Sequence, residues 1–225
     1  MNARADANAI DAIMERASAA SAVTRAFEAA RLCQEALLLA RAADDFERMS
    51  RICLPLQEAR RWIRQDALDA GTVTVVARAS DLPPNPGPGC YLVQPPMIGL
   101  DARLFRDAAW AREIPVFVLC REPMTRDGLW PVVGVGERVA RVRIDPPPAA
   151  VRWAESSGVP RPVCGDLLTG PISPEWFAAA AEALGDRAIA EADALAEPGD
   201  PPAWRVDDLL DYLWACPEHE KLLQA

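Results

Sequence analysis

The first seventy residues follow the apolar spacing of amphipathic helices. Between Thr24 and Ala43, leucine and alanine recur at steps of three and four residues along one stripe. The same spacing predicts an earlier helix over residues 10–17 and a later one over residues 46–67. Asp44 and Asp45 are expected to cap the later helix. Pro55 is expected to kink or split that helix, because proline removes a backbone donor and crowds the preceding turn.

The run from Phe27 to Ser50 resembles a tetratricopeptide repeat. In that family small residues, here Ala36 and Ala40, let two antiparallel helices approach closely. The resemblance covers residues 24–69, about one and a half units, and implies a surface that recognises other proteins. An ordinary helical hairpin with an alanine-rich seam explains the same residues.

A change of period after Gly71 predicts a sheet. Short apolar runs, several rich in β-branched residues, predict five strands, at residues 72–77, 90–94, 115–120, 129–135 and 138–144. A helix capped by Asp101 and running to Arg112 would join the second and third strands as a right-handed crossover. Its buried side is expected to hold Leu104, Phe105, Ala108 and Ala109. The alternation in residues 138–144 places the fifth strand at a sheet edge.

Residues 149–172 are rich in proline and glycine and are predicted to be irregular. Ser173 and Pro174 predict the start of a helix that runs to about Asp193, and a last helix is predicted to start near Val206. The fold class is therefore α+β or α/β, with an N-terminal helical hairpin, a central mixed sheet of about five strands with one βαβ crossover, and C-terminal helices. The predicted parts are residues 1–70, 71–148 and 149–225.

Charge makes one third of this chain unlike the rest. The net charge is −9, and residues 149–225 carry 5 basic and 14 acidic side chains. Because a net acidic chain repels a phosphate backbone, nucleic-acid binding is disfavoured, and no polybasic run would hold the chain to a membrane. A basic protein partner would suit the acidic third.

The cysteines and the first residues indicate the compartment. The six cysteines lie 20 to 52 residues apart with no metal-binding spacing, and His219 is the single histidine. The sequence therefore predicts buried reduced thiols, no metal and no cofactor. Residues 1–10 are polar and contain no apolar signal-peptide core, so a cytoplasmic protein is expected. The preference for arginine and alanine over lysine hints at a bacterial origin.

One crevice could bind a small molecule. In an open α/β sheet, ligands settle beyond the carboxyl ends of parallel strands. Gly99, Asp101, Arg121 and Glu122 would lie there, with the start of a helix offering free N–H groups, Arg121 a positive charge and Glu122 a base. Asp101 itself would oppose an anion. The alternative is that Arg121 and Glu122 only solvate a strand end.

Catalytic signatures are weak throughout the sequence. Cys120 ends a predicted strand and precedes Arg121, which would favour a thiolate, but the only histidine lies about a hundred residues away. The pair Gly134 and Gly136 lacks the third glycine and the helix of a phosphate loop, so a turn is expected.

Two of the seven tryptophans are candidate anchors for a partner. Trp153 and Trp204 are flanked by proline and acidic residues, whereas the others are expected to pack internally. These observations favour a non-catalytic cytoplasmic interaction or scaffold module. The alternative is a small-molecule-binding or enzymatic α/β domain that uses the crevice of Gly99, Asp101, Arg121 and Glu122.

Overall fold

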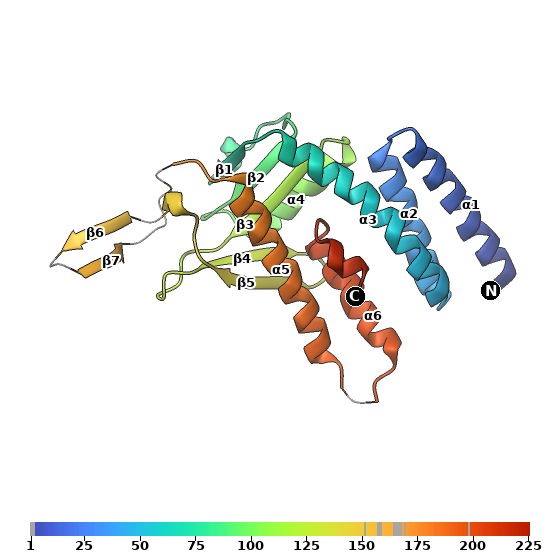
Figure 1. Cartoon of the computed structure of the whole chain (residues 1–225). Coiled ribbons are helices and arrows are strands. Elements are labelled where there is room, and N and C mark those ends of the chain that lie inside the picture. Colours follow the sequence, from blue (N-terminus) through green and yellow to red (C-terminus); the bar gives the residue numbers. More distant parts are fainter. Residues whose placement is uncertain (1–2, 151, 157–158, 164–167, 169, 198) are drawn as a thin grey trace. The chain divides into compact units, whose positions relative to one another are not determined.

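The computed structural model describes residues 3–150, 152–156, 159–163, 168, 170–197 and 199–225. Two compact units make up the chain (Figure 1). Residues 1–65 with 223–225 form a helical unit, and residues 66–222 form a unit that holds the sheet. Together they give the α+β fold class that the sequence predicts, with helices on both sides of the sheet in chain order.

The helical unit is built on a hairpin of two helices followed by a third. Helix α1 (Ala3–Ala22) packs against α2 (Ala26–Ala42), and α3 (Phe46–Asp69) follows. Ala36 and Ala40 of the alanine seam are fully buried, so the helical hairpin is confirmed. Its likeness to a tetratricopeptide repeat stays a prediction.

Side chains at the start of α3 fix its first turn. The carboxylate of Asp45 accepts a hydrogen bond of 3.0 Å from the backbone N–H of Arg48, which confirms this residue as the predicted cap. Asp44, the other predicted cap residue, accepts a hydrogen bond from Arg41 of α2 instead. The guanidinium of Arg48 also donates to both carboxylate oxygens of Asp11 on α1, at 3.0 and 3.1 Å. Of the two outcomes expected at Pro55, a kink or a split, the split does not occur, because α3 continues through this residue as one helix.

The sheet has the strand order β1-β2-β3-β4-β5. Strands β1 (Val73–Val76), β2 (Gly89–Val93) and β3 (Val116–Arg121) are parallel, while β4 (Trp130–Val135) and β5 (Val139–Ile144) run antiparallel as a hairpin. All residues of β2 and β3 are buried, as central strands require, and β5 lies at the edge as predicted.

Helix α4 (Gly99–Ala111) makes the crossover between β2 and β3 and covers one face of the sheet. Phe105 packs edge-on against Tyr91 of β2, with ring centroids 4.9 Å apart. The predicted buried side is partly wrong: Phe105 and Ala109 are buried, but Leu104 is 59% exposed and Ala108 is also exposed. Ala102 joins the core in their place, because residues 102, 105 and 109 share one side of α4 and Leu104 lies on another.

Helix α5 (Pro174–Leu195) covers the opposite face. Phe177 meets Phe117 of β3 edge-on at 4.9 Å, and Trp176 meets Trp130 of β4 at 5.7 Å. Residue 117 alternates with the α4-facing neighbours 116 and 118 along β3, so the two helices contact opposite faces. The hydroxyl of Ser173 accepts a hydrogen bond from the N–H of Trp176, which confirms the predicted helix start.

The predicted irregular segment 149–172 contains a hairpin that sequence reasoning missed. Strands β6 (Arg152–Ser156) and β7 (Val159–Val163) pair antiparallel as a separate two-stranded sheet (Figure 1). The prolines at positions 160 and 162 hid the second strand, because proline cannot donate to a ladder and is read as a strand breaker.

Helix α6 (Pro202–Ala215) packs against α5, and its last residue rests on β4. A Cβ atom at Gly134 would lie 2.5 Å from the carbonyl oxygen of Ala215, and one at Gly136 would lie 2.5 Å from the nitrogen of Ala215. The expectation that these glycines mark a turn is therefore incomplete. They leave space for the chain to pass over the strand end.

Candidate functional site

Two of the four predicted crevice residues build the start of α4. Ile98 is the N-cap, and the carboxylate of Asp101 accepts a hydrogen bond of 2.9 Å from its backbone N–H. Asp101 therefore stands in the first turn of α4, not at the predicted cap position. A Cβ atom at Gly99 would lie 2.6 Å from Val135, so glycine lets α4 lie directly on β4. Asp101 thus places a carboxylate at the helix end where an anion was considered.

Arg121 has internal partners at the end of β3. Only 2% of the residue is exposed, and its guanidinium donates to the side-chain oxygen of Gln94 at 2.7 Å. The same guanidinium lies 4.3 Å from the ring centroid of Trp130, within the range of a cation–π contact. The guanidinium that was predicted to face a ligand is thus buried and contacts Gln94 and Trp130 instead.

Glu122 lies beside Arg121 in the chain but pairs elsewhere. Both of its carboxylate oxygens accept hydrogen bonds from Arg141 of β5, at 2.9 and 2.7 Å. Since alternate residues of a strand face opposite sides, the carboxylate and the buried guanidinium do not converge on one point. A ligand role for Gly99, Asp101, Arg121 and Glu122 stays a prediction, and such a ligand would have to displace the partners just described.

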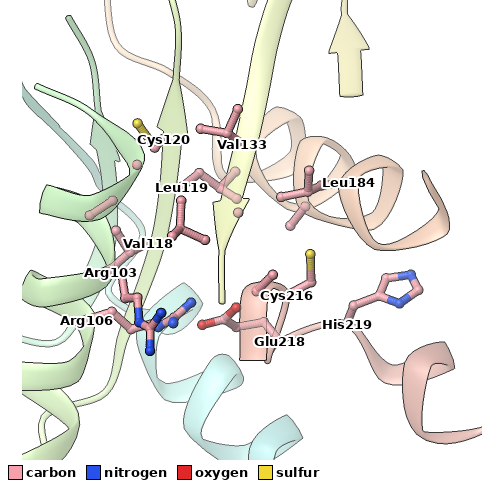
Figure 2. A pocket seen from close by; sticks show the side chains of 16 residues that line it. Arg103, Arg106, Val118, Leu119, Cys120, Val133, Leu184, Cys216, Glu218 and His219 are labelled. Atoms are coloured by element: carbon pink, nitrogen blue, oxygen red, sulfur yellow. The ribbon is translucent and has the colours of Figure 1, made fainter. Parts of the chain in front are cut away.

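A small cavity lies behind the crevice, between α4, β3, β4, α5 and the segment that follows α6. Its volume is about 20 Å³, which is room for roughly one water molecule. Among the four predicted residues, Gly99 alone lines it. Figure 2 shows side chains from three separate parts of the sheet unit around it: Arg103 and Arg106 of α4, Leu184 of α5, and Cys216 and Glu218 after α6.

The cavity also brings together the two groups weighed as a nucleophile and its base, Cys120 and His219. They lie on opposite sides of it, and Figure 2 shows the thiol and the imidazole directed away from each other. Burial raises the pKa of Cys120 to about 12, and the nearby carboxylates of Glu122 and Asp101 add to the effect. Cys120 is therefore a neutral thiol at physiological pH, which disfavours its action as a nucleophile.

Sequence reasoning missed the surroundings of His219. The residue is 3% exposed, and its Nε2 lies 3.2 Å from a carboxylate oxygen of Asp186 on α5 and 3.4 Å from one of Glu182. A Cβ atom at Gly185 would lie 2.0 Å from the imidazole Cγ, so the ring packs directly on the helix backbone. The signal in the sequence was the glycine inside a helical pattern, which costs about 1 kcal/mol relative to alanine unless packing needs it.

The structure separates the two candidate anchor tryptophans. Trp153 lies in β6, and its side chain falls outside the described residues. Trp204 lies in the first turn of α6 and is 59% exposed. Leu195, at the end of α5, is 50% exposed, and the neighbouring Asp193 accepts hydrogen bonds from Arg205. The aromatic ring and the leucine thus belong to one helical hairpin.

We name the end of this hairpin, residues 191–211, the acidic tip. It carries one basic residue, Arg205, against seven acidic ones: Glu191, Asp193, Glu197, Asp200, Asp207, Asp208 and Asp211. Asp208 and Asp211 pair with Arg138 at the turn between β4 and β5, which fixes α6 to the sheet. Asp200 accepts a hydrogen bond of 2.8 Å from the N–H of Glu197 and orders the connecting loop.

Within the described part of the chain, no group of three or more histidine, cysteine or carboxylate side chains could hold a metal ion. In the same residues, no helix combines the length and the apolar character that crossing a membrane requires. No protein-family model matches the chain, and neither a curated protein nor a solved structure shows significant similarity to it. The case for function therefore rests on the chain's own geometry.

Proposed function

We propose that the chain is a non-catalytic protein-interaction module of the cytoplasm, and that its acidic tip binds a basic partner protein. The observation that carries this proposal is Trp204, a large aromatic side chain that is 59% exposed. A buried tryptophan removes about 150–250 Å² of surface from water, and tryptophan is enriched among residues that dominate binding energy. Leu195 offers a second apolar contact on the same hairpin.

The charge around Trp204 defines the partner. Three guanidiniums pair with carboxylates of the acidic tip, Arg205 within it and Arg138 and Arg187 beside it, so seven negative charges against three positive ones leave it negative. A basic surface would be drawn to it and an acidic one repelled. An apolar centre with a charged rim is the usual anatomy of a protein interface. We expect the partner to present a pocket for an aromatic ring bordered by lysine or arginine.

The other groups support an interaction role over a catalytic one. Arg121, Glu122 and Asp101 each have a partner inside the fold, and the thiol of Cys120 is protonated at physiological pH. The free thiols of the described cysteines suit the reducing cytoplasm.

The test is affinity capture from the native host with the full tagged chain. Trp204→Ala removes the anchor, and Leu54→Ala serves as the matched control because Leu54 is 71% exposed on α3 of the helical unit. We expect one protein to co-purify with the wild type and the control and to fall at least about tenfold with Trp204→Ala, since anchor truncations cost about 2 kcal/mol or more. Raising the salt concentration should release the same protein.

Equal recovery by all three proteins would contradict the role of Trp204. If the wild type captures nothing, the interaction reading fails, and the crevice at Glu122 becomes the next place to look. A metabolite that raises the melting temperature of the wild type but not of Glu122→Gln would then establish a small-molecule site.

A further inference from the structure

A buried histidine lies in the last residues of the sheet unit. His219 follows α6, and the exposed fraction of its side chain is 1%. Its ring packs against Gly185 of α5 so closely that even a methyl group at residue 185 would overlap it. Any movement of segment 216–222 away from α5 therefore exposes this imidazole to water.

Charged groups face His219 from each element packed around it. Glu182 and Asp186 approach from α5, and Asp186 also accepts a hydrogen bond of 2.8 Å from Lys221. The remaining charged groups of the segment and of the shared cavity are Glu218, Glu220, Arg103 and Arg106.

The two ring nitrogens of His219 have different surroundings. Nε2 reaches Asp186, which assigns the proton of the neutral ring to this nitrogen. Nδ1 is buried and has no hydrogen-bond partner among the described residues. A second proton would place an N–H donor at Nδ1 without an acceptor, and an unpaired buried donor costs about 1–3 kcal/mol. The docked segment thus accommodates a neutral imidazole better than an imidazolium.

We propose that segment 216–222 is a pH-sensitive latch, docked on α5 and β4 while His219 is neutral and released when the imidazole takes up a proton in water. Burial lowers the pKa of the docked His219 below its usual 6.5, although Glu182 and Asp186 act in the opposite direction. The released imidazole binds a proton below about pH 6.5, whereas the docked imidazole binds one only at lower pH. Acid therefore shifts the equilibrium towards release.

Release of the latch would uncover groups that are now inaccessible. Cys216 is 5% exposed, and its sulfur lies beside Gly134 of β4. Its accessibility reports the latch directly and needs no knowledge of any binding partner. The inference is thus independent of the function proposed for the acidic tip.

The experiment measures thiol labelling of the full chain between pH 7.5 and pH 5. Short pulses of dithiodipyridine, a disulfide that reacts with thiols in acid as well, are followed by peptide mass mapping. The reported quantity is the labelling rate of Cys216 divided by that of Cys33, a fully buried thiol of the helical unit. We expect this ratio to rise by up to tenfold per pH unit between pH 6.5 and the pKa of the docked imidazole.

His219→Gln has no proton to gain in this range, so its ratio should stay constant with pH. Glu15→Gln, an exposed change on α1 of the helical unit, should keep the wild-type response. A flat ratio in the wild type, or an equal rise in His219→Gln, would overturn the proposal. If His219→Gln does not fold, hydrogen exchange of wild-type amides 216–222 relative to those of β3 decides: corrected for intrinsic rates, it must accelerate below pH 6.5 or the latch is refuted.

Discussion

Arg121 and Glu122 carry opposite charges on neighbouring residues, yet they stabilise different parts of the fold. Arg121 is buried between Gln94 and Trp130, whereas Glu122 forms a half-exposed pair with Arg141. A sequence shows that two charged residues are adjacent, but it does not show which of the two side chains will be buried inside the fold. For that reason the predicted ligand pair does not converge in the structure.

Substitutions at these two positions should differ widely in effect. Arg121→Ala removes a buried side chain from Gln94 and Trp130, and we expect a loss of about 2–4 kcal/mol in the free energy of unfolding. Glu122→Gln breaks an exposed ion pair and should cost less than about 1 kcal/mol. Urea denaturation followed by tryptophan fluorescence measures both. Comparable losses would show that the side chains do not occupy the environments described.

Most elements of the sheet unit could be predicted from local pattern. The β-branched run before Ala77, the apolar run of β3 and the cap at Ser173 each gave an element close to its observed position. Periodicity does not fix the phase of a short helix, however, and so Leu104 of α4 was placed inside when it faces solvent.

The close approaches were beyond local prediction. Gly134 and Gly136 look like a turn because the residue that requires them, Ala215, lies about eighty positions further along the chain. Gly185 and His219 form a similar distant pair. A glycine that makes room for another segment has the same local sequence signal as one that bends the chain.

The contact between β4 and the end of α6 predicts a costly glycine substitution. Gly136→Ala places a methyl group against the backbone of Ala215, and we expect a loss of about 1–3 kcal/mol as α6 shifts. Gly87→Ala is the matched control, since a Cβ atom there meets nothing within 4 Å. Its unfolding free energy should stay within about 0.5 kcal/mol of the wild type. A neutral Gly136→Ala would show that α6 does not rest on β4 in solution.

At the scale of the whole molecule, several titrating groups act in the same direction in acid. The pKa of His219 is lowered by burial, and the pKa of Asp186 is lowered by its hydrogen bond from Lys221. Hydrogen bonds from Arg48 lower the pKa of Asp11 and of Asp45. At each of these groups the unfolded chain binds protons at a higher pH than the folded chain does, so acid destabilises the fold.

The urea midpoint of the wild type should therefore fall in two stages on acidification. The first stage lies below pH 6.5, where His219 of the unfolded chain becomes protonated, and the second lies below about pH 4, where the carboxylates follow. Measurements at pH 7.5, 5.5 and 3.5 separate the stages. His219→Gln should lose the first stage and keep the second. A midpoint that rises between pH 7.5 and 5.5 would contradict the lowered pKa of His219.

The contact of Ala215 with Gly134 and Gly136 also determines when this part of the sheet can be completed during synthesis. The hairpin of β4 and β5 is complete once residue 144 has left the ribosome, but the residues that cover its glycines are translated some seventy positions later. Throughout that interval the strand end at Gly134 lacks the segment that covers it in the finished fold. Chaperones that recognise exposed apolar strands would meet the chain in this window, and the emergence of α6 would end their access.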